Sequence, residues 1–220
     1  MVHDINDEDE QLDALKSWWK RYGTSLCVVI LLAMAAFFGW NTWQRHKAYE
    51  DNQASQLYDQ LDEMTNNFTV LNSQQRGQVN QLADQLVNNH GNTRYADLAR
   101  LIEARVAIQA NDNGTATASL QDLISRSNDS FMTTLAHIDL ARVQINNKQY
   151  DQALSSLPKE VPHTLSVLLH SVRGDALAGL KRFPDARKAY EQALQDAQKY
   201  KLPDYGIQLK LDDLAPQEAS

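Results

Sequence analysis

Residue types that interrupt or crosslink a chain are scarce in this sequence. Its 220 residues include one cysteine, 5 prolines and 8 glycines. The single cysteine, Cys27, excludes an intramolecular disulfide and any metal site built from several cysteines. Alanine, leucine and glutamine are plentiful, and these side chains lose little entropy in a helix. The sequence therefore predicts an all-α protein.

A cluster of basic residues is also missing. The net charge is -7 at pH 7 and the isoelectric point is about 5.3. Binding along a nucleic-acid backbone needs a basic patch or stripe that neutralises phosphates. The sequence therefore predicts no nucleic-acid partner.

The motifs of common catalytic and cofactor sites are absent as well. The sequence contains no G-x-S-x-G, no Walker motif and no G-x-G-x-x-G. Its six histidines, among them His137 on a predicted helix, show no H-E-x-x-H spacing. The adjacent Asp212 and Asp213 lie in the tail and are interpreted as a solvated surface. We therefore expect no enzyme activity, no cofactor and no bound metal.

One long apolar stretch stands out from a chain whose mean hydropathy is -0.51. No charged residue lies between Arg21 and Arg45, and the 23 residues between them would form a helix about 34 Å long. The hydrocarbon core of a bilayer is about 30 Å thick. Aromatic residues flank the stretch, as they do at the water interfaces of membrane helices: Trp18, Trp19 and Tyr22 before it, Trp40 and Trp43 at its end. The stretch predicts a transmembrane helix at residues 23–43.

Two alternatives to a membrane anchor stay open. A buried helix of a soluble domain is one, although such a helix seldom carries tryptophans at both ends. A cleaved signal peptide is the other, since Ala33 and Ala35 form an A-x-A pattern. The segment before Lys16 carries six acidic residues and no lysine or arginine, however, and the alanines lie inside the apolar run. We therefore expect an uncleaved anchor.

The flanking charges predict the orientation of the anchor. Three basic residues precede the span and two follow it: Lys16, Lys20 and Arg21, then Arg45 and Lys47. Basic flanks tend to stay in the cytoplasm, so the bias favours a cytoplasmic N-terminus. We expect a single-pass membrane protein with three parts: an acidic cytoplasmic segment at residues 1–22, the transmembrane helix at 23–43 and a domain on the other side of the membrane at 44–220.

A pattern of small residues repeats in the C-terminal half. Three units share internal spacings of twelve and then four residues, in steps of 37 and 33 residues: Ala104, Ala116 and Leu120; Ala141, Ala153 and Leu157; Gly174, Ala186 and Tyr190. The steps are close to the roughly 34 residues of a tetratricopeptide repeat. Alanine and glycine let two antiparallel helices approach closely. The pattern predicts a tetratricopeptide-like domain packed through Ala104, Ala116, Ala141, Ala153, Gly174 and Ala186, with a generic helical bundle as the alternative.

Segments outside these units complete the predicted domain. Turn-forming residues separate the helices within the units, at 111–114, 146–148 and 181–184. Upstream, apolar residues at helical spacing predict a capping pair of helices at 47–64 and 74–89. The apolar tail at 207–214 is the candidate for the cap at the other end.

The repeat register also gives a candidate binding surface. If Ala104 and Ala141 are equivalent, residues one and five positions later and one turn earlier share the concave face. The predicted groove consists of Leu101, Arg105, Gln109, Ile138, Arg142 and Asn146. Its arginines would hold carbonyls or carboxylates of a partner. The alternative is local pairing of Arg105 with Glu103 and of Arg142 with Asp139.

Several motifs carry a resemblance to a known family. The most specific are Gly39-Trp40-Asn41-Thr42-Trp43, Leu140-Ala141-Arg142-Val143-Gln144 and Arg173-Gly174-Asp175-Ala176-Leu177. With the acidic start, the Trp18-Trp19 pair and the closing segment 208–214, they cover nearly the whole chain. The chain resembles the YfgM family, the ancillary subunits of the SecYEG protein-translocation channel. It departs from that family in an Asn- and Gln-rich turn before Ser73 and in a tail past Leu214.

The resemblance implies a location, partners and a function. The implied location is the bacterial inner membrane, with the domain at 44–220 in the periplasm. The implied partners are the SecYEG translocon, a PpiD-type periplasmic chaperone and client polypeptides, to which the apolar span adds membrane lipid. The implied function is a non-catalytic scaffold that helps to transfer secreted proteins to the periplasmic chaperone network. Two alternatives stay open: an assembly scaffold for another envelope complex, and a stress-response regulator that acts through the acidic stretch Asp4 to Asp13.

Overall fold

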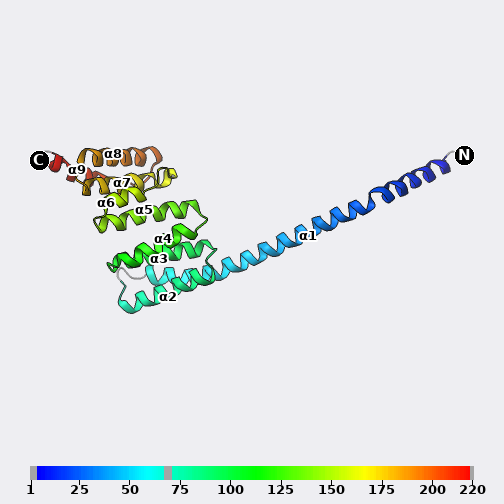
Figure 1. The fold of residues 1–220 in the computed structure, drawn as a ribbon, viewed down its shortest axis with the longest axis horizontal. Coiled ribbons are helices and arrows are strands. Elements are labelled where there is room, and N and C mark those ends of the chain that lie inside the picture. The colour runs from blue at the N-terminus through cyan, green and yellow to red at the C-terminus, as the bar shows by residue number, and fades with distance from the viewer. Residues whose placement is uncertain (1–3, 67–70, 219–220) are drawn as a thin grey trace. The chain divides into compact units, whose positions relative to one another are not determined.

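The computed structural model describes residues 4–66 and 71–218, and within them the side chains of 16–23, 25, 27–66 and 71–214. Every regular element in this part of the chain is an α-helix, which confirms the all-α prediction (Figure 1). The helices are α1 (Asp4–Asn66), α2 (Ser73–Asn89), α3 (Arg94–Gln109), α4 (Asn113–Arg126), α5 (Ser130–Asn146), α6 (Tyr150–Ser156), α7 (His163–Gly179), α8 (Phe183–Tyr200) and α9 (Ile207–Glu218). The chain divides into two compact units, Met1–Glu50 and Asp51–Ser220, so α1 contributes residues to both.

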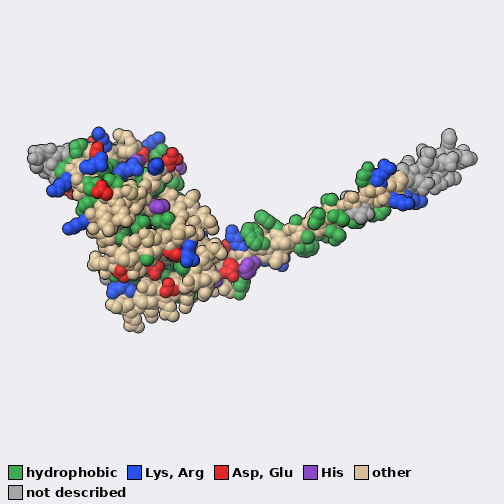
Figure 2. Space-filling model, viewed as in Figure 1, with side chains coloured by type: hydrophobic (Ala, Val, Ile, Leu, Met, Phe, Trp, Pro, Cys, Tyr) green, Lys and Arg blue, Asp and Glu red, His purple; other side chains and the backbone are tan. Residues whose placement is uncertain are grey.

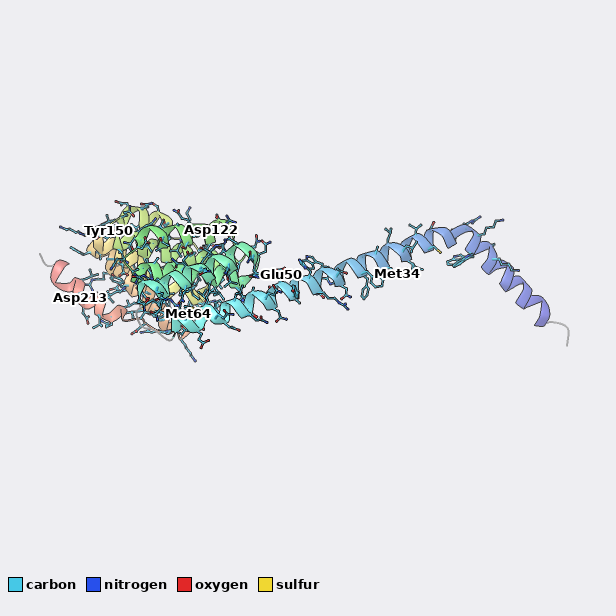
Figure 3. The ribbon with its side chains drawn as sticks, turned by 90° about the horizontal axis from the view of Figure 1, so that it is seen from below. Met34, Glu50, Met64, Asp122, Tyr150 and Asp213 are labelled. Carbon is cyan, nitrogen blue, oxygen red and sulfur yellow. The ribbon has the colours of Figure 1, made fainter. Side chains whose placement is uncertain are left out.

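Helix α1 carries the apolar stretch. Its large apolar side chains from Val28 to Trp40 are all exposed, between 44% for Met34 and 67% for Phe37. Hydrophobic side chains are spread along this segment, with backbone and other atoms between them (Figure 2), and Figure 3 marks the segment by Met34. Among the described helices, α1 is the one with the length and composition to cross a membrane.

Helix α1 also runs further than the sequence predicts. The expected helix at 47–64 is not a separate element but the C-terminal part of α1, because no proline or glycine interrupts the chain between Gly39 and Asn66. In the second unit, Ala54 and Leu61 are fully buried in one core cluster with residues of α2 and α3. Helix α2 begins with a capping box between Asn72 and Gln75, which satisfies backbone N–H groups at the helix start.

The three predicted repeats are the helix pairs α3–α4, α5–α6 and α7–α8, which stack on one another (Figure 1). The turn inside each pair has the same geometry. Asn111, Lys148 and Lys181 adopt left-handed φ angles of 59°, 60° and 60°, and they repeat in the same steps of 37 and 33 residues. The next residue in each turn donates a backbone hydrogen bond back to the first helix: Asp112 to Ala107 at 2.9 Å, Gln149 to Gln144 at 2.8 Å and Arg182 to Leu177 at 2.9 Å. The three units therefore share one turn conformation, in which a left-handed residue ends the first helix.

Small residues occupy the contacts inside the pairs. Of the six predicted packing positions, Ala116, Ala141, Ala153 and Ala186 are fully buried, Ala104 is 2% exposed and Gly174 is buried. A Cβ atom on Gly174 would lie 2.5 Å from Cδ1 and 2.8 Å from Cζ of Tyr190. The ring of Tyr190 on α8 thus rests against the backbone of α7, an approach that any larger residue at 174 would obstruct.

Helix α9 covers the end of the stack. Ile207, Leu211 and Leu214 are buried and pack in one core cluster with Tyr190 and Ala193 of α8. The turn before it begins at Lys201, where a left-handed residue ends α8. The apolar tail therefore forms a helix that shields the last pair from solvent.

Candidate interaction surface

The first helices of the three pairs present a row of charged residues. Arg105, Arg142 and Asp175 each follow a packing position directly, on α3, α5 and α7. Because the three units share a register, these residues occupy equivalent places along the stack. We call them the charged row. Their surroundings differ from unit to unit, and this difference determines which of them a partner can use.

Arg105 is exposed, and its charge acts on one of two packed aromatic rings. The rings of Tyr58 on α1 and Tyr95 on α3 pack with their centroids 5.6 Å apart. Burial raises the pKa of the Tyr58 hydroxyl, Asp62 adds to this shift, and the positive charge of Arg105 opposes it. The charge of Arg105 therefore acts on the Tyr58 hydroxyl.

Arg142 forms the local ion pair that the sequence left as an alternative. One of its guanidinium nitrogens donates to Asp139 at 2.8 Å, and its side chain is 42% exposed. Burial raises the pKa of the Asp139 carboxyl, although Arg142 acts against this shift. The sequence offered Glu103 as the local partner of Arg105. In the structure Glu103 accepts a hydrogen bond from Ser119 at 2.8 Å.

Asp175 is held within the domain. The ammonium group of Lys210 on α9 donates to both of its carboxylate oxygens at 2.8 Å, and the Tyr190 hydroxyl donates to one of them at 2.7 Å. Lys210 also donates to Ser171 at 3.1 Å. The third residue of the charged row is thus already paired with a residue of the C-terminal helix α9. Sequence reasoning missed this contact, although the shared register of Asp175 with the two arginines was a usable signal.

The remaining predicted groove residues divide between surface and core. Gln109 and Asn146 are exposed near the ends of α3 and α5. Leu101 is half-buried and packs against the core cluster of the first and second pairs. Ile138 is fully buried in the cluster formed by α5, α6 and α7, so it offers no surface to a partner in this structure. The next pair covers it because α7 packs directly on α5.

A buried arginine lies between α3 and α4. Arg100 is 1% exposed; its Nε donates to Asp122 at 2.5 Å, and its Nη1 lies 3.7 Å from Asp97. Its two terminal nitrogens have no hydrogen-bond partner among the described residues. Burial alone would raise the pKa of Asp122, but Arg100 and Arg126 together lower it. Arg100, His137 and His170 occupy equivalent positions in the three units. The spacing is visible in the sequence, but our prediction did not use it.

A polar cavity of about 460 Å³ opens between two loops of the same region. Its walls include Arg94 and Asp129, which form an ion pair at 2.8 Å, and Asp97, which accepts a hydrogen bond from Ser127 at 2.5 Å. Positive and negative groups thus already pair with one another inside the cavity. In the part of the chain that the structure describes, no three His, Cys, Asp or Glu side chains group closely enough to hold a metal ion.

Comparison with known proteins places the chain in a family. A sequence model described as "Tetratricopeptide repeat-like domain" matches residues 16–216. A Haemophilus influenzae protein is 30% identical over 205 residues, which cover 89% of this chain and 96% of that protein. An Aggregatibacter actinomycetemcomitans protein is 30% identical over 94% of this chain and 98% of its own length, and an Escherichia coli protein is 26% identical over 95% and 97%. All three are named "Ancillary SecYEG translocon subunit". The chain belongs to the YfgM family.

Membership of the YfgM family confirms the resemblance that the motifs predicted, and it spans both structural units, since the match begins at residue 16. No solved structure matches the chain. Helical repeats of this family type build surfaces for other proteins, which directs attention to the charged row rather than to a catalytic centre.

Proposed function

We propose that this YfgM-family protein is a non-catalytic ancillary subunit of the SecYEG translocon that binds other proteins through its helical repeats. The observation that carries this proposal is the full-length similarity to relatives with that name, which covers 89% to 95% of the chain in the three proteins described above. Both the apolar helix and the repeat domain are included in the match, so the similarity concerns the whole architecture.

The proposal includes a membrane anchor. In α1 the exposed apolar segment, with aromatic side chains at both ends, fits insertion into a bilayer better than burial in a protein core. We propose that residues 1–22 lie in the cytoplasm, that 23–43 cross the inner membrane and that 44–220 form a periplasmic domain. Protease added to spheroplasts tests this orientation, because it should digest the repeat domain; survival of the domain beside a digested periplasmic control would reverse the orientation.

The proposed task is to receive secreted polypeptides and pass them to the periplasmic chaperone network, with a PpiD-type chaperone as neighbour. The proposed contact surface consists of Leu101, Arg105, Gln109, Arg142 and Asn146; Ile138 is left out because it is fully buried. The exposure of Arg105 supports this choice, since an exposed guanidinium can hold a backbone carbonyl or a carboxylate of a partner. Arg142 would exchange its pairing with Asp139 for a partner's acceptor.

Crosslinking of the intact protein in membranes, followed by identification of its neighbours, tests the proposed function. We expect translocon subunits and periplasmic chaperones among the products. Exclusive crosslinks to another envelope complex would instead favour an assembly scaffold. The variant with Arg105→Ala and Arg142→Ala should lose contacts to clients, because it removes the two arginines of the charged row. It should keep its thermal stability, since exposed ion pairs contribute only about 0 to 1 kcal/mol.

A further inference from the structure

The second helix of the middle pair is much shorter than its counterparts. Helix α6 has 7 residues, whereas α4 has 14 and α8 has 18. It ends at Ser156, and residues 157–162, which include Pro158 and Pro162, lead to α7 without regular structure. We call residues 157–162 the connector. A helix as short as α6 is not stable alone in water, so it depends on its contacts with neighbouring helices.

A polar contact between the two helices of a pair is missing from the middle pair. Arg100, His137 and His170 occupy equivalent positions on α3, α5 and α7. Arg100 pairs with Asp122 of α4, and Nε2 of His170 lies 3.5 Å from Asp196 of α8. Helix α6 ends too early to present an acid to His137, whose Nδ1 is buried without a hydrogen-bond partner among the described residues. The C-terminal end of α6 therefore lacks the polar contact that α4 and α8 make.

The interface between α5 and α6 also contains an unpaired amide. Gln144 on α5 is 4% exposed, and its Oε1 has no hydrogen-bond partner in the described part of the chain. The equivalent residues are Ala107, which packs in one cluster with residues of α4, and Leu177, which packs with residues of α8. The shared register therefore places Gln144 against α6. A buried carbonyl without a donor loses the hydrogen bonds that water would supply, so Gln144 favours an open interface more than an apolar residue would.

Only a few side chains hold α6 in place. Ala153 is fully buried, Leu157 at the start of the connector is 8% exposed, and Leu154 packs partly buried beside them. The ring of Tyr150 rests on the backbone of α7 at Gly179, where a Cβ atom would overlap it. Helices α5 and α7 contact each other directly. The contacts of α6 can therefore break while α5 and α7 stay together.

We propose that α6 and the connector open as one unit while α5 and α7 stay folded and packed on each other. Opening exposes the apolar core cluster that Ala153 and Leu157 share with residues of α5 and α7. The domain thus has a covered apolar surface at its middle pair, which becomes accessible without unfolding of the flanking pairs. The proposal concerns this chain alone and does not depend on the translocon or on any partner.

Hydrogen exchange of the full-length chain in detergent, read at single residues by mass spectrometry, tests the opening. The matched probes are the amides of Ala116, Ala153 and Ala186. These residues occupy equivalent positions and are fully buried, and their N–H groups donate to the carbonyls four residues earlier at 3.1, 2.9 and 2.9 Å. Without local opening the three amides should be protected alike. We expect the Ala153 amide to exchange at least about tenfold faster than the other two after correction for intrinsic rates, which corresponds to about 1.4 kcal/mol.

Two leucine variants test the cause of the opening. Gln144→Leu introduces the side chain of the equivalent Leu177, so exchange at Ala153 should slow by about tenfold, with no change at Ala116 and Ala186. Gln152→Leu, on the exposed side of α6, is the control and should leave all three rates unchanged.

Three results would each overturn the proposal. They are equal protection of the three alanine amides in the unmodified chain, exchange of α5 and α7 in step with α6, and equal effects of the two leucine variants. None of these measurements involves the translocon or a client, so their failure is distinct from failure of the proposed function.

Discussion

The close contact between Gly174 and Tyr190 reverses the effect expected of a common substitution. A glycine inside an exposed helix is normally about 1 kcal/mol less favourable than alanine, so Gly→Ala usually stabilises. At Gly174 the new methyl group would meet the ring of Tyr190, which is 3% exposed and is held at its far end by a 2.7 Å hydrogen bond to Asp175. Overpacking of this kind costs about 1 to 3 kcal/mol. We expect Gly174→Ala to lower the free energy of unfolding by about 1 kcal/mol, after the helix propensity of alanine is subtracted from the cost of overpacking.

The matched control is Gly77→Ala in α2. Gly77 is exposed, and a Cβ atom there would have no heavy atom within 4 Å, so this substitution should stabilise by up to about 1 kcal/mol. Thermal unfolding of the intact chain in detergent, followed by circular dichroism, measures both. For a domain of this size, about 1 kcal/mol lowers the melting temperature by about 2 to 4 °C. Shifts of the same sign in the two variants would show that Tyr190 does not pack on Gly174 as described.

Three other substitutions test separate features. Ala153→Leu should destabilise by about 1 to 3 kcal/mol because Ala153 is fully buried, whereas Leu at the exposed neighbour Gln152 should be near neutral; equal melting temperatures would contradict the packing of α6. Burial raises the pKa of the Glu103 carboxyl, so the folded state keeps a proton that the unfolded state has released, and stability falls as pH rises above the ordinary value of about 4.3. Glu103→Gln should therefore stabilise at pH 7 and have little effect at pH 4 in urea unfolding, and an effect that is independent of pH would refute the burial argument. Lys210→Met should cost about 1 kcal/mol because it removes the ion pair with the partly exposed Asp175, and added salt should shrink the difference from the unmodified chain.

The repeats could be predicted from sequence because their signal is steric. A close contact between two helices admits only small residues. Ala141, Ala153 and Gly174 therefore identify the contacts in the sequence, although the residues around them differ between the units. The same register predicts the turns, where Lys148 and Lys181 adopt a left-handed conformation that neither residue type favours. Family membership followed from short motifs that lie at these contacts and at the end of the apolar span.

Other features depend on placement in three dimensions and had no local signal. Ile138 was assigned to the groove from its spacing to Ala141 on the first helix of a pair. That spacing does not show how deeply the next pair buries the residue. The ion pair between Asp175 and Lys210 joins residues 35 apart in the sequence, and it forms only because α9 packs on α8. Helical periodicity describes a face of one helix, whereas these contacts depend on which helix packs against that face.

The first pair differs from the others for a reason that the structure makes clear. Arg100 occupies the register of His137 and His170, but as a buried guanidinium it needs acidic partners, and Asp122 on α4 provides the nearest one. A buried ion pair adds little net stability, yet removal of one partner leaves an uncompensated charge that costs several kcal/mol. The contact of α3 with α4 therefore adds a charged pair to its buried alanines, whereas the contact of α7 with α8 includes the fit of Tyr190 against a glycine. Substitutions at the two contacts should therefore act through different chemistry, charge at Arg100 and steric fit at Gly174.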